Sequence, residues 1–390
     1  MPELCELCRR DALQPAYAPE RTQRGITVHI CAHCGLVQSL PRADRAPRSA
    51  PAVSSGADWG NVRYGKGFRT QIAVDAVLRH RCAASSFSLL DVGSNRGRFA
   101  RALLDKAPAA NLVAVEPDER VAGSCAGLER VELHVGRIED VALETARFDV
   151  IHSCHTIEHL AHPADVLADH WRCLKAGGLL VLDAPNIALI GADDIVEEWF
   201  IDKHLTHFSQ RTLIRMIEAA GFSLVEKPDP ADRENIFLVA KKSALGDQAI
   251  SGDPEEVHRA NALLSTYAAT RAANLSALGA VAAELRSLAH KGLAIWGAGR
   301  IFDSLVVHGG FDTKSLRLLI DTHLKAHVGE RHGCALAAPE ALAEAKPGVI
   351  AVMSRGFADE IAVEARRLAP HAEIILYADL LGRARLRPAA

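Results

Sequence analysis

The sequence predicts an α/β protein, in which a Rossmann-like parallel sheet is flanked by a cysteine-rich N-terminal module and a second, C-terminal Rossmann-like unit. Three observations predict this organisation. An apolar run at 87–92 ends in a turn of small residues, and an amphipathic helical pattern follows it. Four more apolar runs follow at spacings that suit the crossover connections of a parallel sheet. The C-terminal part of the chain repeats the strand and glycine turn in shorter form.

The length and composition set limits on the fold and on the partners. A chain of 390 residues is too long for one ordinary domain, so two or three are expected. A net charge of −3, without a sustained Lys or Arg block, argues against a large nucleic-acid surface. No apolar run approaches the roughly eighteen residues of a membrane span, and the first residues do not resemble a signal peptide. We expect a cytoplasmic protein with no membrane or nucleic-acid partner, and the oligomeric state stays open.

Residues 1–42 are expected to form a zinc-binding module. Four of the nine cysteines form two Cys-x-x-Cys pairs, a spacing that is typical of a metal site rather than of a disulfide framework. Four thiolates suit tetrahedral zinc, and a site closed by four protein ligands is structural. Such a short segment cannot bury a sufficient core, so zinc binding would supply folding free energy. The predicted ligands are Cys5, Cys8, Cys31 and Cys34.

A Pro- and Ser-rich linker leads to the main domain, which is expected over 59–242. An amphipathic helix is predicted from about Phe68 to Arg81. Tyr64, just before this helix, is a candidate to reach a cofactor or substrate across the strand ends. The alternative for Tyr64 is an aromatic side chain that only packs.

The turn after the first strand of this domain is a predicted ligand loop. Gly93 and Gly97 have no Cβ, so a ligand can approach the backbone N–H groups at the start of the following helix. The second apolar run, 112–115, ends in Glu116. An acidic side chain at this strand tip suits a ribose with two free hydroxyl groups.

The order of these landmarks resembles the class I S-adenosylmethionine (SAM) methyltransferases. Their pattern has an acid-x-Gly-x-Gly-x-Gly loop, an acid ending the second strand, a glycine-acid turn after the third and a Phe-Asp start of the fourth. Asn95 stands where the middle glycine is usual, and Arg137 where an Asp is common. The resemblance covers 87–242 and implies SAM as the cofactor. The residues expected to hold it are Tyr64, Asp91, Gly93, Asn95, Gly97, Glu116, Pro117, Ile138, Glu139, Cys154 and His155.

The rest of the chain follows from helix and strand signals. After the fifth strand, 179–184, an insertion leads to a helix over 210–220, and two strands at 222–226 and 235–240 are expected to close the sheet as an antiparallel pair. Asp253 and Pro254 then begin a predicted linking helix, 253–290. The C-terminal Rossmann-like domain is expected over 291–385. Its Gly297-Ala298-Gly299 turn lacks a clear third glycine, so a structural or substrate-holding role is favoured over redox use of NAD.

Over its whole length the chain resembles the deoxysugar C-methyltransferases of antibiotic biosynthesis. That family joins a zinc-binding module, a SAM domain and a C-methyltransferase C-terminal domain, and residues 31–38 closely match its second cysteine pair. The resemblance implies a small-molecule substrate, a nucleotide-linked sugar. The family's active-site histidines fall on His159 and His204, but Lys203 replaces a glutamate and a His-Gly-Gly segment is absent. These departures leave carbon and oxygen methylation both open.

The chemistry requires that the acceptor lose a proton as the methyl group is transferred. Imidazole titrates near neutral pH, so we expect His204 to act as the base and His159 as its partner or as the electrophile. Asp202 and His207 are second candidates. The alternative is that these histidines only cap and pack.

Two other functions fit parts of the sequence. An RNA methyltransferase would grip nucleic acid with a basic N-terminal module, and arginines at 9, 10, 21, 24, 42, 45 and 48 favour it. A non-catalytic scaffold that keeps SAM without turnover is the other alternative.

Overall fold

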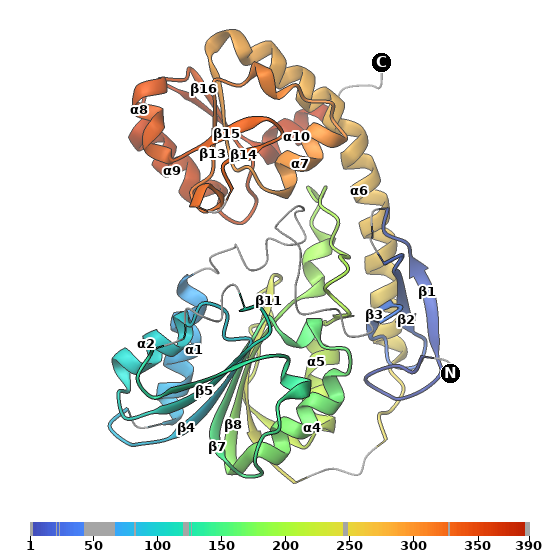
Figure 1. The fold of residues 1–390 in the computed structure, drawn as a ribbon. Coiled ribbons are helices and arrows are strands. Elements are labelled where there is room, and N and C mark those ends of the chain that lie inside the picture. The colour runs from blue at the N-terminus through green and yellow to red at the C-terminus, as the bar shows by residue number, and fades with distance from the viewer. Residues whose placement is uncertain are drawn as a thin grey trace. The chain divides into compact units, whose positions relative to one another are not determined.

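The chain folds into two compact units in a computed structural model (Figure 1). The described part of the first unit comprises 3–42, 67–190 and 200–264, and that of the second comprises 191–199 and 265–386, with short gaps. Among the described residues, no helix is both long enough and apolar enough to cross a membrane. The structure describes residues 3–20, 22, 24–42, 67–81, 83–119, 125, 127–244, 249–326 and 328–386.

A seven-stranded sheet forms the centre of the first unit, in the order β10-β11-β8-β7-β4-β5-β6. The five strands from β8 to β6 are parallel, whereas β11 runs antiparallel to β8 and to β10. This confirms the Rossmann-like α/β prediction. The strands are β4 (Ser88–Val92), β5 (Asn111–Glu116), β6 (Val131–Val135), β7 (Phe148–Cys154), β8 (Leu174–Pro185), β10 (Phe222–Glu226) and β11 (Asn235–Lys242).

Strand β8 begins before the stretch expected from the sequence. Its first residues precede the expected start at 179 and already pair with β7, with Phe148 opposite Leu174. The register then shifts at a bulge or irregularity between Phe148 and Val150. The glycines at 177 and 178 therefore lie within a strand.

Helices cover both faces of this sheet (Figure 1). Alternate strand residues face opposite sides, so Leu89 and Val150 pack with α1 and α2, whereas Leu90 and Ile151 pack with α4 and α5. Helix α5 begins at a capping box, in which Ser209 Oγ accepts the Thr212 N–H at 3.1 Å. The helices are α1 (Gly67–His80), α2 (Arg98–Lys106), α4 (Pro163–Cys173) and α5 (Gln210–Ala219).

Helix α4 carries a histidine that should make the unit sensitive to acid. The His170 side chain is buried, and neither ring nitrogen has a hydrogen-bond partner. Burial lowers the pKa of His170 to about 4, below the value of about 6.5 in an unfolded chain. The neutral ring therefore stabilises the fold fully above pH ~6.5, and this stabilisation is lost as the pH falls through 4.

We expect His170→Leu to reduce the loss of stability between pH 7 and pH 4 by about 3 kcal/mol, as measured by urea unfolding at the two pH values. Ala168→Leu, which adds a leucine at an exposed position of the same helix and removes no titratable group, is the control and should keep the wild-type pH dependence. Equal losses in wild type and H170L would contradict this assignment.

The N-terminal residues form a second sheet with a strand from far along the chain. Its antiparallel order is β1-β2-β3-β9, and β9 follows the insertion after β8. Phe208, directly after β9, forms a bridge with Asn186 at the end of β8. The N-terminal module and the end of the insertion therefore share one sheet through β9, and the bridge at Phe208 links this segment to the end of β8. The strands are β1 (Leu13–Tyr17), β2 (Thr27–Cys31), β3 (Val37–Leu40) and β9 (Thr206–His207).

The second unit contains a six-stranded sheet in the order β14-β15-β13-β12-β16-β17, in which the described pairs are parallel except β14 with β15. Residues 191–199 of the insertion belong to this unit, where Arg355 Nη2 binds Glu197 at 2.7 Å. Helix α6 begins in the first unit and continues into the second. The elements are α6 (Pro254–Leu288), β12 (Leu293–Trp296), α7 (Arg300–Val307), β13 (Leu318–Ile320), β14 (Glu330–Arg331), β15 (Cys334–Ala337), α8 (Leu342–Ala345), β16 (Val349–Val352), α9 (Ala358–Leu368), β17 (Glu373–Leu376) and α10 (Tyr377–Arg385).

Candidate functional site

The described cofactor candidates lie at the carboxyl ends of the parallel strands of the first unit. This edge is where open α/β sheets bind ligands. Loops after β4, β5, β6 and β7 supply most of the described cofactor candidates, and the segment before β9 supplies His204. Tyr64 lies outside the described residues.

The loop after β4 is closed by its own hydrogen bonds. The N–H groups of Gly93 and Ser94 both donate to the Val115 carbonyl, at 2.9 and 3.1 Å. Asn95 N–H donates to Glu116 Oε2 at 2.8 Å, and the next two N–H groups also have partners within the loop. The N–H groups of residues 93–97 therefore already have hydrogen-bond partners within the protein.

The two glycines of the loop are explained by the neighbouring side chains of the protein. Both have positive φ angles, 74° at Gly93 and 68° at Gly97. A Cβ on Gly93 would lie 2.2 Å from Thr156 Oγ1, and a Cβ on Gly97 would lie 2.7 Å from Cys125 Sγ. The lack of a side chain at Gly93 and Gly97 therefore leaves room for Thr156 and Cys125, and this explains both glycines without reference to a ligand.

Gly97→Ala should destabilise the protein by about 1–3 kcal/mol more than Gly127→Ala, as measured by urea unfolding. Gly127 is the matched control because its φ of 81° is similar but no atom lies within 4 Å of its added Cβ. Adding Cys125→Ala to G97A should recover most of the difference, since it removes the sulfur. If both glycine variants were equally stable, the contact with Cys125 would not matter.

Asp91, a predicted cofactor residue, is buried beneath this loop. Its Oδ1 accepts a hydrogen bond from His152 Nδ1 at 2.7 Å, and the His152 ring stacks on Phe99 with 3.7 Å between ring centroids. Asp91 is 1% exposed. This carboxylate can therefore position the loop and the histidine, but it does not present a surface to a ligand.

Glu116 bridges the first and second ligand loops. Its two carboxylate oxygens accept the N–H groups of Asn95 and Asp118, at 2.8 and 2.9 Å. Burial, opposed by these two hydrogen bonds, raises the pKa of Glu116. Of the other candidates nearby, Pro117 and Glu139 are exposed and Ile138 is buried.

A second polar group follows β7 and includes two residues that the sequence analysis passed over. Asp183 on β8 is buried and forms an ion pair with Arg69 of α1. Cys154 Sγ lies 3.7 Å from Asp183 Oδ2, and the His155 N–H donates to the Asp183 carbonyl at 2.8 Å. Burial raises the pKa of Asp183 to about 6, and it raises that of the Cys154 thiol. The sequence could have indicated a role for Asp183, because it is the single carboxylate in the apolar run 179–184. No sequence feature indicated a role for Arg69.

The turn after β7 brings two predicted histidines together with a buried acid. Glu158, His159 and His204 each place one potential ligand atom within 4.8 Å of the others. His159 Nδ1 bonds the Lys203 carbonyl at 2.8 Å, so Nδ1 carries the hydrogen and Nε2 is left with its lone pair. This Nε2 lies 3.7 Å from Glu158 Oε1, and His155 Nδ1 lies 3.8 Å from the same oxygen.

The environment favours the uncharged forms of Glu158 and His159. Glu158 is 2% exposed, and neither carboxyl oxygen has a hydrogen-bond partner. Burial raises the pKa of Glu158 to about 8. The surrounding protein also lowers the pKa of His159, although 38% of its side chain is exposed. The sequence analysis did not single out Glu158, because an acidic residue between two histidines in a short turn is expected to be exposed to solvent.

The remaining catalytic candidates are held by the N-terminal module. The His207 ring is buried in β9, its Nε2 lies 2.8 Å from Ser39 Oγ, and burial lowers its pKa to about 3. Asp202 Oδ1 accepts the Arg24 N–H at 3.2 Å. The main chain at Leu205 contacts both neighbouring segments. The Leu205 N–H donates to the Glu158 carbonyl at 2.7 Å, and the Leu205 carbonyl accepts a hydrogen bond from the Ser39 N–H at 2.9 Å. These contacts position His204 between the module and the turn after β7.

The four module cysteines form one cluster. Cys5 and Cys34 have sulfur atoms 3.5 Å apart, as do Cys8 and Cys31, and all four sulfurs lie within 4.8 Å of one another. Four sulfurs at ~2.3 Å from one zinc ion would lie about 3.8 Å apart. The cluster therefore fits the predicted metal.

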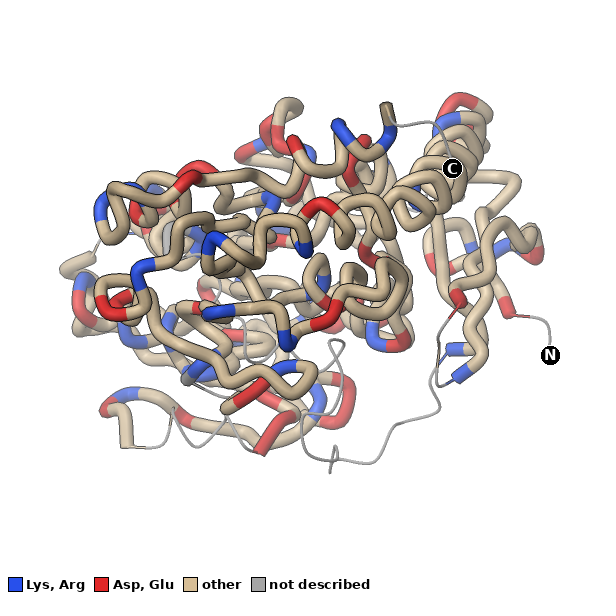
Figure 2. The backbone as a smooth tube through the Cα atoms, turned by 90° about the horizontal axis from the view of Figure 1, so that it is seen from above, with Lys and Arg blue, Asp and Glu red and all other residues tan. Residues whose placement is uncertain are grey.

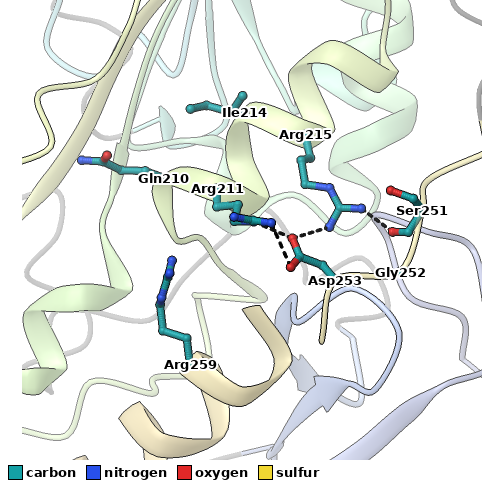
Figure 3. Close-up of a pocket in the computed structure, with 8 residues that line it drawn as sticks. All are labelled: Gln210, Arg211, Ile214, Arg215, Ser251, Gly252, Asp253 and Arg259. Atoms are coloured by element: carbon teal, nitrogen blue, oxygen red, sulfur yellow. Dashed lines mark hydrogen bonds and ion pairs between the residues drawn. The ribbon is translucent and has the colours of Figure 1, made fainter. Parts of the chain in front are cut away.

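An open hollow of about 560 Å³ lies elsewhere in the first unit, between α5 and the start of α6 (Figure 3). Three arginines line it, but their charges are compensated. Arg211 and Arg215 bind Asp253 at 3.0 and 3.2 Å, and Arg259 binds Glu256 at 3.1 Å. This hollow contains none of the predicted site residues.

Comparison with known proteins identifies the central sheet. Residues 65–227 match a family model described as a methyltransferase domain. This part of the chain is a methyltransferase domain. A protein of Mycolicibacterium smegmatis, named a probable S-adenosylmethionine-dependent methyltransferase, is 28% identical over 160 residues, which are 40% of this chain and 59% of that protein. The chain thus spans less than two thirds of this relative.

Solved structures resemble parts of the chain at low identity. One is the complex between the Haloferax volcanii Trm112 methyltransferase activator and a methyltransferase, with 15% identity and a TM-score of 0.40, covering 50% of this chain and 100% of that chain. Another is the Burkholderia thailandensis 1,6-didemethyltoxoflavin-N1-methyltransferase, with 17% identity and a TM-score of 0.37, covering 59% of this chain and 100% of that chain. The family model ends at 227, so the narrower likeness to deoxysugar C-methyltransferases stays a prediction.

Proposed function

We propose that the chain is a SAM-dependent methyltransferase that acts on a small molecule, namely a nucleotide-linked sugar or a related glycan precursor. The observation that carries the proposal is the cluster of two imidazoles and a buried acid at the ligand-binding edge of the methyltransferase domain. A methyl acceptor on a sugar, whether carbon or oxygen, must lose a proton, and imidazoles assist proton removal near neutral pH.

SAM would supply a methyl group on a positively charged sulfur, and Glu116 is the residue best suited to hold its ribose. Each Glu116 oxygen accepts one backbone N–H, and a carboxylate oxygen can accept a second hydrogen bond. Pro117, Glu139 and His155 follow β5, β6 and β7 at the same edge of the sheet. We assign Asp91, Gly93, Asn95 and Gly97 to shaping the loop, and Ile138 and Cys154 to its packing.

The proton would be removed with the help of His204 and His159. His159 presents a nitrogen with a lone pair, and its lowered pKa keeps that nitrogen unprotonated at neutral pH. Two imidazoles can serve in two ways: one can accept the proton directly, or both can hold a cation that makes the acceptor more acidic. We assign Asp202 and His207 to supporting His204, because both bind the N-terminal module.

We assign a structural zinc ion to the cysteine cluster, because four thiolates leave no coordination position for a substrate. The sugar assignment is supported by the order of zinc module, methyltransferase domain and C-terminal sheet. In that sheet the Asp321 carboxylate holds the glycine turn after β12, accepting the Ala298 N–H at 3.0 Å.

The basic side chains give little support to the RNA alternative. Figure 2 shows Lys and Arg interspersed with Asp and Glu along the described chain. Within the N-terminal module Arg9 binds Glu6 and Asp165, and Arg42 binds Glu3 and Glu6. Arg24 binds Asp202 and the Pro41 carbonyl. These three arginines bind the protein's own acids or carbonyls, whereas Arg10 is exposed; the arginines at 21, 45 and 48 lie outside the described residues.

The test is incubation of the full chain with SAM and a panel of nucleotide sugars and RNAs, with release of S-adenosylhomocysteine as the measurement. We expect turnover with at least one nucleotide sugar and none with RNA. Turnover on RNA alone would overturn the proposal. SAM binding without turnover on either class would favour the scaffold alternative.

A further inference from the structure

We infer that Glu158, His159 and His204 bind a divalent first-row transition-metal ion, at a second metal site distinct from the four-cysteine cluster. The first observation is the grouping itself. One carboxyl oxygen and two ring nitrogens lie within 4.8 Å of one another, in a turn after β7 and in the segment before β9. Two ligands at about 2.1 Å from one ion in a tetrahedral site lie about 3.4 Å apart. The separation of 3.7 Å between His159 Nε2 and Glu158 Oε1 is close to this value.

The second observation is the state of Glu158. Its side chain is 2% exposed, and neither oxygen has a hydrogen-bond partner. The nearest ring nitrogens that face it, on His155 and His159, are 3.8 and 3.7 Å away, beyond hydrogen-bond distance. A buried carboxyl group without a hydrogen-bond partner costs free energy, and a proton alone would leave a hydroxyl that still needs an acceptor. A cation held between the carboxylate and the imidazoles removes this cost.

The third observation is the orientation of His159. Its Nδ1–H donates to the Lys203 carbonyl at 2.8 Å, which fixes the ring and leaves the Nε2 lone pair available beside Glu158. Metal-ligating histidines regularly donate their other ring N–H to a carbonyl or carboxylate in this way. The segment that carries His204 is also fixed, through the main-chain hydrogen bond from Leu205 to the Glu158 carbonyl at 2.7 Å.

The ligand chemistry selects the class of ion. Two imidazoles and one carboxylate suit Zn²⁺, Fe²⁺, Co²⁺ or Mn²⁺ better than Ca²⁺ or Mg²⁺, which prefer oxygen ligands. Three protein ligands leave at least one coordination position open, in contrast to the closed cysteine cluster. The open position can take an oxygen atom of the acceptor.

The role of this ion rests on the proposed methyl transfer, whereas its binding does not. When a hydroxyl or enol oxygen of the acceptor binds the cation, its O–H becomes more acidic and the proton leaves to solvent. The acceptor, as an alkoxide or enolate, then attacks the methyl carbon. The bond from oxygen or carbon to the methyl group forms as the S–CH₃ bond breaks, and the electron pair of that bond stays on sulfur as S-adenosylhomocysteine.

The experiment is a Co²⁺ titration of the full chain after treatment with a mild chelator, followed by calorimetry and visible absorption. Cobalt in the cysteine cluster gives an intense sulfur-to-metal charge-transfer band, which nitrogen and oxygen ligands do not give. We expect wild type to bind a further Co²⁺ equivalent without that band. Glu158→Gln and His204→Gln should each weaken this second binding at least about 100-fold, because each removes one ligand from the site. His134→Gln, on β6, is the matched control and should bind as wild type does.

Several outcomes would overturn the inference: no second equivalent in wild type, or a second equivalent that persists unchanged in E158Q and H204Q. The thermal unfolding midpoint of each variant shows whether it is folded, and H204Q tests the site independently if E158Q is unstable. The same samples separate this inference from the proposed function. If the second Co²⁺ binds but no nucleotide sugar is turned over, the metal site is supported and the proposed function is overturned. Turnover that is unchanged after the ion is removed leaves the function standing and the ion without a role.

Discussion

Replacing His204 by Gln is expected to lower kcat for methyl transfer by about 10²–10⁴-fold, with SAM affinity unchanged within about twofold. The imidazole is lost from the cluster with Glu158 and His159, whereas the loops after β4 and β5 that would hold SAM are untouched. The loss is expected whether the imidazole accepts the proton or holds a cation. The measurements are S-adenosylhomocysteine release under single-turnover conditions and SAM binding by calorimetry.

His159→Gln should reduce kcat to a similar extent, and the double variant should be little worse than either single one, because the two rings act on one proton. His134→Gln is the control and should keep the wild-type rate. A near-normal rate in H204Q would show that the group assisting proton removal lies elsewhere. A loss of SAM affinity equal to the loss of rate would show instead that His204 supports the cofactor.

Replacing Cys8 and Cys31 by Ser should abolish the zinc binding that we propose for the cysteine cluster and lower kcat at least about 100-fold, although neither residue belongs to the candidate site. Without the ion the short β1-β2-β3 sheet has too little core to stay folded. Strand β9 would then lose its partner, and Ser39 would no longer hold Leu205 and His207. His204, two residues before β9, would lose its position.

The measurements for this variant are zinc content, methyl transfer and SAM affinity, which should fall far less than the rate. Cys334→Ser, which changes a half-buried thiol of the second unit, is the control and should keep zinc and activity. A variant that lost its zinc but kept full turnover would show that the module does not position His204.

The parts of the fold that sequence patterns predict are those with local signals. Apolar runs ending at Val92 and Glu116, the first of them followed by a glycine turn, were enough to predict the parallel sheet, because strand and turn preferences act over a few residues. The pairing of β3 with β9 joins residues that are far apart in the chain, and Thr206–His207 is too short to show a period. The sequence therefore could not show that the module and the His204 segment form one sheet.

The candidate site likewise contains residues that local sequence signals indicate and residues that they do not. His159 and His204 were found because their residue type and place after predicted strands indicated chemistry. Glu158 was missed because its importance comes from burial, and burial of an acid is decided by the segments that fold over it. The loop glycines were found for a reason that was incomplete, since the sequence cannot show that Thr156 and Cys125 occupy the space beside them.

The division of the insertion between the two units has a consequence for the order of folding during synthesis. Residues 191–199 leave the ribosome before α6, yet their partners are Asn274, which donates to the Asp193 and Ile195 carbonyls, and Arg355, which binds Asp194 and Glu197. The residues of β10 and β11 are therefore synthesised before this segment can meet its partners. Until Arg355 emerges, we expect the carboxylates of Asp194 and Glu197 to stay hydrated, because burying a charged group without a partner is costly, and we expect this charge to oppose a premature collapse of the segment onto the first unit.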